Sequence, residues 1–450
     1  MEALWALGLF VVVASVLMLG FPVAFTLGGV SLWFAFAGWL AGWFDATFIM
    51  AMPERIYGIM RNSTLMAVPV FIFMGLVLEK AKLAQSLLEN MAALLGGAKG
   101  GLGFSLLIVG TLLAASTGIV GATVVTLSLL AMPVMKKNGY DESLSAGTIC
   151  ATGTLGQIIP PSIVLVLLGD VLSNAYQQAQ INQGIFSPKT VSVGDLFLGA
   201  IVPGLILVSA YALYWLYVIL RFPDKAPAGK KTSNAISTMQ ILGSLLPPLL
   251  LIIAVLGSII SGIATPTEAA SVGAIGALVL ALFKGQLNKK ILLEISQEAV
   301  KVSAMIFMIL IGAALFSLTF KGFHGDEIIR HFLSHLPGGK YTAFMIVMLV
   351  MFLLGFILDF IEITFVIIPI VGPILLMLGF EPVWLGIMFA INLQTSFLTP
   401  PFGFALFYLQ GATKIDSIKL YKGVLPFIII QLLVLALLMW QPKLTNLLHF

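Results

Sequence analysis

The sequence predicts an all-α polytopic membrane protein built from two inverted-topology repeats, and three observations support this prediction. Hydrophobic residues make up 60% of the 450 residues and charged residues only 9%, whereas a soluble domain carries about 25% charged residues. A stretch with a double proline recurs at the same place in each half of the chain. Each half also contains five apolar segments long enough to span a bilayer.

The recurring stretch runs from Pro133 to Pro161 and again from Pro373 to Pro401, 240 residues later. Both copies end in a double proline inside an apolar segment. Proline lacks the backbone N–H and clashes with the preceding turn, so each helix must break there. A break at membrane depth is tolerated only where the freed backbone is buried in protein or lines a polar cavity. Two such breaks at matching points of two half-chains indicate the binding site of a transporter.

We predict about ten transmembrane spans, because an apolar segment of about 20 residues can cross a bilayer. They lie near 3–19, 22–43, 62–79, 144–169 (broken), 196–220, 238–257, 266–283, 302–320, 384–411 (broken) and 423–440. The start of the chain lacks the basic flank of a signal peptide, so we expect it to be a retained first span. Two more apolar stretches, 101–135 and 341–378, are interrupted at their middles. Each is either two full spans or one re-entrant hairpin with its tip at mid-membrane.

Basic residues predict which connections face the cytoplasm. If 221–235 is cytoplasmic, alternation puts five segments on that side, and they carry 16 of the 23 lysine and arginine residues, in agreement with the positive-inside rule. The five segments are 80–100, 136–143, 221–235, 284–301 and 412–422. Both termini are then outside. Five spans per half is an odd number, so the second half is inserted upside down relative to the first. The predicted divisions are a first repeat 1–225 (hairpin or span pair 101–135, broken helix 144–169), a cytoplasmic linker 226–235, and a second repeat 236–450 (hairpin or span pair 341–378, broken helix 384–411).

Composition also argues against other classes of protein. The single cysteine, Cys150, lies in an apolar run, which excludes an intramolecular disulfide and a cysteine metal cluster. The net charge of +4 reflects lysine-rich connections rather than a nucleic-acid surface. The predicted spans contain no histidine and no nucleophile–base set. We therefore expect that the protein is not an enzyme.

Three carboxylates have both a functional and a structural interpretation. Ionisable groups at mid-membrane cost roughly 2.5–3.5 kcal/mol each on insertion scales, so Asp359 and Glu362, in the middle of the second long stretch, require an explanation. They either form a cation or proton site, or cap the N-terminus of a half-helix, where the helix dipole favours negative charge. Glu268 follows Thr265-Pro266-Thr267, which is a good helix start, so the capping interpretation is favoured there.

Hydroxyl-bearing and small residues gather at four places within the apolar stretches. A hard cation such as sodium prefers oxygen ligands, and half-helix N-termini present N–H groups to an anionic solute. The alternative is that small residues simply allow close helix packing. The four clusters are Ser116-Thr117-Gly118, Thr152-Gly153-Thr154 with Gly156, Gly355, and Ser396 with Thr399. The candidates for solute binding are Thr154, Gln157, Asp359, Asn392 and Gln394.

Five motifs together resemble the large membrane (permease) subunit of tripartite ATP-independent periplasmic (TRAP) transporters over essentially the whole chain. They are VPVFIFMG (68–75), GYD (139–141), GTLGQIIPPSI (153–163), GIATPTEAAS (262–271) and SFLTPPFG (396–403). The segments LDFIEIT and NLQTSFLTPPFGFALFYL look most similar to the mannitol/chloroaromatic-like branch, which is associated with 2-oxo acids and other carboxylates.

The resemblance implies an elevator-type sodium symporter. If the chain follows that family, 101–135 and 341–378 are re-entrant hairpins, and each hairpin tip meets a broken helix at a sodium site. The resemblance implies a first site at Ser116, Thr117 and Gly118 with carbonyls around Gly156, Ile159 and Pro161, and a second at Gly355, Ser396 and Thr399 with the carbonyl near Phe402. Many members read Ser-Gly-Ser at the first tip. This chain reads Ser-Thr-Gly, so the hydroxyl that binds sodium there stays open.

The resemblance also implies partners and a location. A periplasmic substrate-binding protein delivers the solute, and a small four-helix membrane subunit flanks the large one in the bacterial inner (cytoplasmic) membrane. We expect that this small subunit is a separate protein, since the chain has no extra spans. The expected function is sodium-coupled import of small organic acids. The alternative is a self-sufficient sodium- or proton-coupled dicarboxylate or citrate carrier that needs no binding protein.

Overall fold

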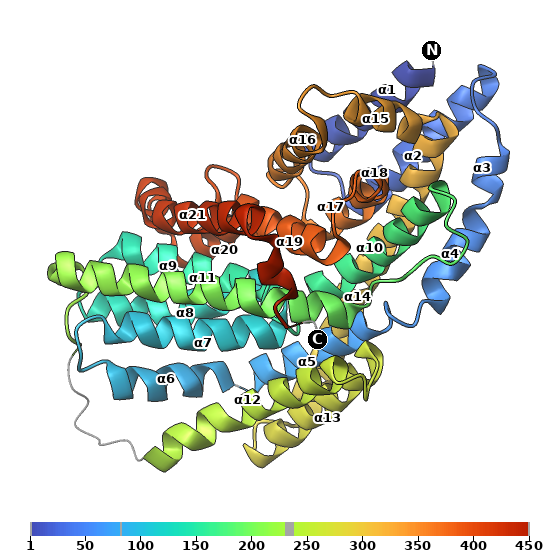
Figure 1. Ribbon diagram of the computed structural model, residues 1–450. Coiled ribbons are helices and arrows are strands. Elements are labelled where there is room, and N and C mark those ends of the chain that lie inside the picture. Colours follow the sequence, from blue (N-terminus) through green and yellow to red (C-terminus); the bar gives the residue numbers. More distant parts are fainter. Residues whose placement is uncertain (1, 82, 230–237, 449–450) are drawn as a thin grey trace. The chain divides into compact units, whose positions relative to one another are not determined.

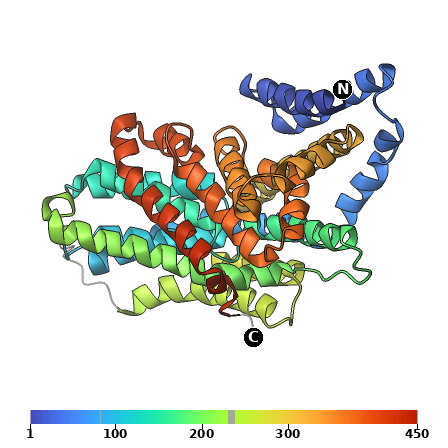
Figure 2. The ribbon, with the colours of Figure 1, turned by 45° about the horizontal axis from the view of Figure 1, so that its top comes forward.

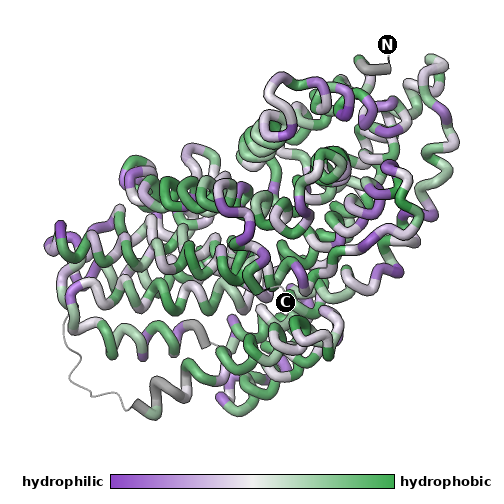
Figure 3. The backbone as a smooth tube through the Cα atoms, in the orientation of Figure 1, coloured by the Kyte–Doolittle hydropathy of each residue, from purple (hydrophilic) through white to green (hydrophobic). Residues whose placement is uncertain are grey.

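The computed structural model describes residues 2–81, 83–229 and 238–448, and most of them lie in helices. In these three ranges there is no β-strand, and the one isolated bridge joins Lys99 to Ala228 (Figure 1). Hydrophobic residues follow the long helices, and hydrophilic residues gather at the connections (Figure 3). The chain is therefore an all-α polytopic membrane protein, as the sequence predicts.

The chain divides into two compact units, and each contains segments from both halves of the sequence. The first unit comprises Met1–Met66, Leu167–Ser192 and Val300–Leu385. The second comprises Ala67–Val166, Val193–Ala299 and Gly386–Phe450.

The first unit is assembled from three separate segments of the chain. Its helices are α1 (Glu2–Met18), α2 (Val23–Leu40), α3 (Thr47–Met50), α4 (Met52–Arg61), most of α10 (Ile163–Asn182), most of α14 (Lys289–Gly322), α15 (Gly325–Ser334), α16 (Gly339–Leu354), α17 (Phe360–Val366) and α18 (Ile368–Met377). α1 packs on α2, and α15 and α16 both pack on α18 (Figures 1 and 2). The apolar side chains of Met52, Leu315 and Leu318 bury one face of α4 against α14.

The second unit is a larger bundle that contains both double prolines. Its helices are α5 (Ala67–Lys80), α6 (Leu83–Leu95), α7 (Gly101–Thr117), α8 (Val120–Lys137), α9 (Glu142–Thr154), η1 (Leu155–Gln157), α11 (Val193–Arg221), η2 (Pro223–Lys225), α12 (Thr238–Ile260), α13 (Pro266–Phe283), most of α19 (Pro382–Leu398), α20 (Phe404–Thr413), α21 (Ser417–Trp440) and η3 (Pro442–Asn446). α9 packs on α7, α8 and α21, and α5 packs on α13. α7, α8, α9 and α11 run alongside one another in Figure 1.

Both double prolines lie in breaks between helices. α9 and η1 end at Gln157 and α10 begins at Ile163, so Pro160-Pro161 falls in the gap, and its peptide bond is cis. α19 ends at Leu398 and α20 begins at Phe404, with the cis Pro400-Pro401 bond between them. The two breaks are therefore where the missing proline N–H groups require them.

α7 and α8 form a helix pair with a two-residue turn, and α16 to α18 form a longer interrupted one. The first turn contains Gly118, whose φ of +62° is the left-handed conformation that glycine adopts without strain. In the second stretch α17 and α18 are bent by 58° at their junction near Ile367. Each of the two long apolar stretches is thus broken near its middle.

The spans differ in detail from the ten predicted. Within the described residues, six helices are long and apolar enough to cross a membrane, or seven if α17 and α18 count as one bent span. Several others, including α1, α7, α16 and α19, are apolar but shorter. Helices also occur in three connections between the predicted spans, where the count of apolar residues predicted none. α6 lies in 80–100, the start of α14 in 284–301, and α15 in 321–340. These segments are amphipathic or polar, so only their 3.6-residue period indicates a helix.

The beginning of the predicted linker is held to the turn between α6 and α7. The Gly100 N–H donates to the Ala226 carbonyl at 3.0 Å, and the Gly229 N–H donates to the Gly96 carbonyl at 2.7 Å. Residues 230–235 of the linker lie outside the described residues.

Candidate functional site

The turn between α7 and α8 lies against the first helix break, and both belong to the second unit. A side chain at Gly156 would meet the Ala114 carbonyl oxygen at 2.9 Å, and one at Gly118 would meet the Ile163 backbone nitrogen at 3.2 Å. α5 closes the third side, because a Cβ at Gly75 would lie only 3.0 Å from the Thr117 Cα. The structure thus places the end of α7 and Gly118 against Gly156 and the start of α10, and the first predicted sodium site lies in these segments.

Oxygen atoms dominate this junction. The Thr117 and Thr123 hydroxyl oxygens are 2.7 Å apart, and the Thr117 and Ser116 hydroxyls each donate to the Leu113 carbonyl at 2.9 Å. Ser116 and Thr117 are both buried. Hydroxyl and carbonyl oxygens without a carboxylate are the donors that suit a hard monovalent cation, so these residues fit sodium.

A second feature of the same unit is a buried group of amides and hydroxyls. Gln394 Nε2 lies 3.4 Å from Thr154 Oγ1, which joins α19 to the end of α9 across 240 residues of sequence. Gln157, less than one turn beyond Thr154, is completely buried, and among the described residues neither its amide nitrogen nor its amide oxygen has a hydrogen-bond partner. The Gln394 amide oxygen also has no partner there.

Unpartnered buried amides are costly. A buried polar atom left without a hydrogen bond costs about 1–3 kcal/mol, so native proteins retain such atoms where a ligand or an ordered water satisfies them. Three of the five candidate solute-binding residues, Thr154, Gln157 and Gln394, therefore lie in one buried polar group. Asn392, on α19, is also buried.

The second predicted sodium site is divided between the units. Gly355 ends α16 in the first unit, where its backbone is helical. Ser396, Thr399 and Phe402 belong to the second unit, at and beyond the end of α19. The Thr399 hydroxyl donates to the Thr395 carbonyl at 2.7 Å, and the side chain of Phe402 is exposed.

The carboxylates of the acidic segment form a capping box. Asp359 precedes α17, and its carboxylate accepts the Phe360 N–H at 2.6 Å, while Glu362 accepts the Asp359 N–H at 2.8 Å. Glu268 and Thr265 form the same motif at the start of α13. The structural interpretation of all three carboxylates is thus present in the molecule. A role of Asp359 in solute binding stays a prediction.

Three residues of the first junction were not predicted to belong to it. Ser162 lies in the break and donates its hydroxyl to the Gly156 carbonyl at 2.8 Å, Thr123 faces Thr117 from the next helix, and Gly75 admits the Thr117 backbone. Ser162 directly follows the double proline, so its position in the break was a usable signal. Thr123 and Gly75 carried no local signal, because their role depends on which helices meet.

Comparison with known proteins places the whole chain in one family. Residues 10–444 match the family model described as the tripartite ATP-independent periplasmic transporter, DctM component. The C4-dicarboxylate TRAP transporter large permease protein DctM of Vibrio cholerae is 28% identical, over 96% of this chain and 95% of that protein. The sialic acid TRAP transporter large permease protein SiaM of the same organism is 27% identical, over 96% of both chains. The isethionate TRAP transporter permease protein DctMQ of Oleidesulfovibrio alaskensis is 29% identical, and this chain covers 57% of it.

Two solved transporters share the fold. The YdaH transporter of Alcanivorax borkumensis superposes with a TM-score of 0.64 at 16% identity, over 87% of both chains. MtrF of Neisseria gonorrhoeae superposes with a TM-score of 0.61 at 13% identity, over 87% of this chain and 82% of that one. At these identities the likeness concerns the fold alone.

Proposed function

Because the chain belongs to the TRAP transporter family as its DctM component, the large permease subunit of a multi-pass inner-membrane transporter, we propose that it imports small organic acids, carboxylates among them, by sodium-coupled symport. A periplasmic binding protein delivers the solute, and a separate small four-helix subunit flanks this chain in the membrane. The chain moves the solute without changing it chemically.

The buried amides of the second unit are the observation that carries the solute site. Among the described residues, neither the amide nitrogen nor the amide oxygen of Gln157 has a partner, and the amide oxygen of Gln394 has none either, while the Gln394 amide nitrogen donates to Thr154. A carboxylate or α-hydroxy or α-oxo group accepts such donors, and half-helix N-termini add further N–H groups. We assign solute binding to Thr154, Gln157 and Gln394, with Asn392 and Asp359 as additional contacts.

The class of solute is supported by the relatives. Their names give C4-dicarboxylates, sialic acid and isethionate as solutes. All three are organic anions that differ in size and shape. An organic acid is therefore the solute class proposed for this chain.

Sodium is proposed as a co-transported ion. At the first junction it would be held by the hydroxyls of Ser116 and Thr117 and by carbonyls between Gly156 and Pro161. A second ion would be held by Gly355, Ser396, Thr399 and the carbonyl near Phe402. When bound, sodium supplies positive charge beside the solute, and its inward gradient supplies the free energy of uptake. The protein residues themselves position oxygen atoms and exclude water.

Alternating access is proposed to follow an elevator-type movement. Each half of the chain contributes an interrupted apolar stretch followed by a helix broken at a double proline. Two such halves in inverted orientation form equivalent structures that face opposite sides, and exchanging their conformations opens the site to one side and then the other.

Uptake into proteoliposomes tests the proposal. The chain is reconstituted alone and together with the small subunit and the binding protein, and a panel of carboxylates is offered with an inward sodium gradient or a proton gradient. We expect uptake only with all three proteins and sodium. Uptake by this chain alone would instead support the self-sufficient carrier.

Substitution of a proposed ligand tests the second sodium position. Thr399→Ala removes one hydroxyl while the helix break remains, so we expect the protein to insert normally and sodium-dependent uptake to be lost. The matched control is Thr413→Ala, at the end of α20, whose hydroxyl bonds only to the preceding turn in the same way. Uptake by Thr399→Ala at the wild-type rate and sodium dependence would remove the second site from the proposal.

A further inference from the structure

The first unit contains a cavity that the proposed function does not use. It has a volume of about 680 Å³, within the range of about 300–1,000 Å³ that small-molecule sites occupy. Its walls are α4 and the residues after it, the second half of α10, the end of α14, and single residues of α17 and α18. All of these belong to the first unit. We call it the outer cavity.

The outer cavity opens on the side that the distribution of basic residues places outside the membrane. α14 starts in the cytoplasmic segment 284–301 and has 34 residues, which is about 50 Å of helix. Its last turn, with Lys321, is therefore on the outer side. α4 and the end of α10 lie in segments that the same rule places outside. A solute arriving from outside meets this cavity.

Its lining combines polar and apolar groups, which suits a small organic molecule with polar substituents. Side-chain amides and one hydroxyl line the walls: Asn62, Asn174, Gln177, Gln178, Asn182 and Ser317. The walls are anchored to one another, because Asn62 donates to the Asp170 carboxylate at 2.7 Å and Met52 packs on Leu315 and Leu318. These contacts connect the walls of the outer cavity to one another.

Two cations in the lining lack partners. Lys321 is half-buried on α14 and Arg55 is exposed on α4, and within the described residues neither side chain makes a hydrogen bond or a salt bridge. The Arg55 and Lys321 charges lie close enough to repel, while Asp326 attracts Lys321 without forming an ion pair. Two like charges held near one another in a partly desolvated space are stabilised by an anion placed beside both.

The carboxylates around the cavity have other interactions or positions. Asp170 accepts the amide of Asn62, and Glu327 faces His324 at 3.9 Å. Asp326 and Glu54 lie in the first turns of α15 and α4, where the helix dipole favours them. Lys321 also lines a smaller adjoining cavity of about 210 Å³, together with Arg330. Glu54 and Asp170 also line the cavity, so an anion would be placed beside Arg55 and Lys321 and away from these two carboxylates.

We propose that the outer cavity binds the carboxylate of an incoming solute between Arg55 and Lys321, as a first binding position separate from the buried amides of the second unit. This inference rests on the proposed function in taking the solute to be an organic acid. The amides of α10 then bind its uncharged polar groups. Arg55 and Lys321 raise the local concentration of anions beside them.

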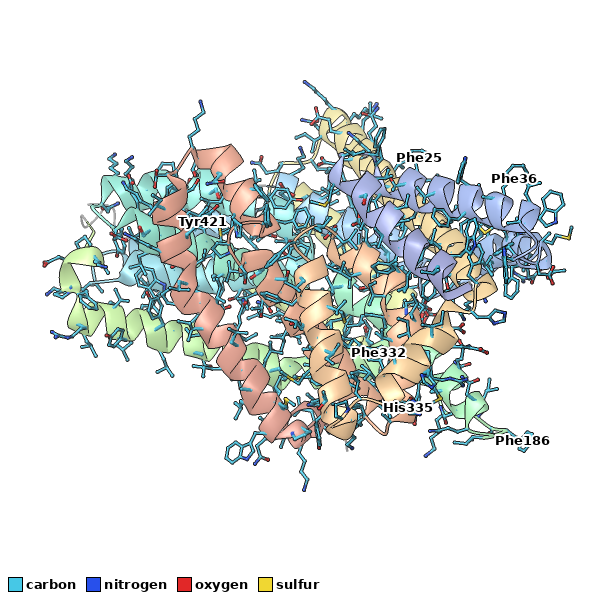
Figure 4. The ribbon with its side chains drawn as sticks, turned by 90° about the horizontal axis from the view of Figure 1, so that it is seen from above. Phe25, Phe36, Phe186, Phe332, His335 and Tyr421 are labelled. Atoms are coloured by element: carbon cyan, nitrogen blue, oxygen red, sulfur yellow. The ribbon has the colours of Figure 1, made fainter. Side chains whose placement is uncertain are left out.

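The charge preference is tested first, without any solute. Cys150 is the only cysteine and is buried, so Ser317→Cys in a Cys150→Ala background places one thiol in the outer cavity. Ser187→Cys is the matched control, since it lies beside Phe186 on the exposed connection after α10 (Figure 4). Each thiol reacts with an anionic and with a cationic methanethiosulfonate at low ionic strength. We expect the anionic-to-cationic rate ratio to be roughly tenfold higher at position 317 than at 187.

The two cations are then removed. Arg55→Gln, on the exposed face of α4, and Lys321→Met should each lower the ratio at position 317 toward that at 187. Lys189→Met, which removes an outer lysine that does not line the cavity, should leave it unchanged. Equal ratios at both positions, or a ratio that is insensitive to Arg55 and Lys321, would overturn the proposal.

Uptake by the complete transporter gives the second measurement. With the carboxylate that the wild-type complex takes up, we expect Lys321→Met to raise KM about tenfold with kcat unchanged, and Lys321→Arg to restore it. The same carboxylate should protect the thiol at position 317. Carboxylate uptake with an unaltered KM in both Arg55→Gln and Lys321→Met would overturn this inference and leave the proposed function standing. Uptake of uncharged solutes alone would overturn both.

Discussion

At the scale of single residues, a substitution of Gln157 can distinguish a role in solute binding from a role in stability. The side chain is buried, and neither amide atom has a partner among the described residues. Replacing such a group by an apolar one of similar size removes a desolvation cost and no hydrogen bond. A buried glutamine whose amide atoms all bond to the protein would instead lose hydrogen bonds, and therefore stability, on the same replacement.

We predict that Gln157→Leu keeps or raises the unfolding temperature and weakens solute uptake at least tenfold in kcat/KM. The control is Gln180→Leu, in which a buried glutamine loses hydrogen bonds to Tyr176 and to both backbone groups of Lys189. That variant should lose stability. Thermal unfolding in detergent and proteoliposome uptake measure the two effects. A Gln157→Leu protein that unfolds as early as Gln180→Leu would make Gln157 a structural residue.

Glu142 shows how a surface charge joins the two sequence halves. Its carboxylate contacts Lys136 at 2.8 Å and Lys419, from the second half, at 2.7 Å. The hydrogen bonds from Lys136 and then Lys419 lower the pKa of Glu142 from 4.5 to about 2. Because the folded-state pKa is lowered, the stabilisation is complete above the unfolded pKa of about 4.5 and is lost as the pH falls toward 2.

We predict that Glu142→Gln lowers the unfolding temperature at pH 7 by a few degrees and that this difference shrinks as the pH is lowered from 5 to 3. Glu294→Gln, which removes an exposed carboxylate without an ion pair among the described residues, should show no such pH-dependent difference. Unfolding scans at several pH values make the comparison. A Glu142→Gln difference that stays constant from pH 7 to pH 3 would mean that the ion pairs do not stabilise the fold.

At the scale of elements, close backbone contact sets how α9 meets α21. Gly147 and Gly423 lie at the crossing, where a side chain at either glycine would run into a backbone carbonyl of the other helix. Only helices without side chains at this point approach so closely, as small residues permit in membrane bundles. This contact brings α21 against the helix that leads into the first break.

We predict that Gly423→Ala destabilises the protein by about 1–3 kcal/mol, the usual cost of overpacking. The matched control is Gly411→Ala on α20, where nothing lies within 4 Å of the new methyl group. That substitution should stabilise the helix by about 0.5–1 kcal/mol. Unfolding in denaturant compares the two signs. Equal effects of the two alanines would show that α9 and α21 do not touch at Gly423.

At the scale of the whole molecule, the orientation in the membrane is a prediction of the basic residues alone. The segment after α10 should lie outside, and the turn between α13 and α14 should lie in the cytoplasm. Alkaline phosphatase folds only outside the cytoplasm. A phosphatase fused after Ser187 should therefore be active, and one fused after Gly285 inactive. The reverse pattern would invert the orientation and move the outer cavity to the cytoplasmic side.

The sequence alone determined the class of fold, the helix breaks and the family. Apolar length and proline chemistry are local properties, so the breaks at Pro160-Pro161 and Pro400-Pro401 were predictable without coordinates. The capping of α17 by Asp359 and Glu362 was one of two interpretations that the sequence left open, and the structure shows the capping box. The polar helix α15 was missed, since its sequence resembles a connection when only apolar length is counted.

Only the tertiary structure decided which distant residues meet. Thr154 contacts Gln394 across 240 residues, Gly75 leaves room for the backbone of Thr117, and Arg55 and Lys321 line one cavity from helices in different halves of the sequence. These contacts depend on how helices pack, and packing is settled by complementary shapes along whole helix faces rather than by any local motif. The amide group and the outer cavity are therefore properties of the fold, although each of their residues can be read in the sequence.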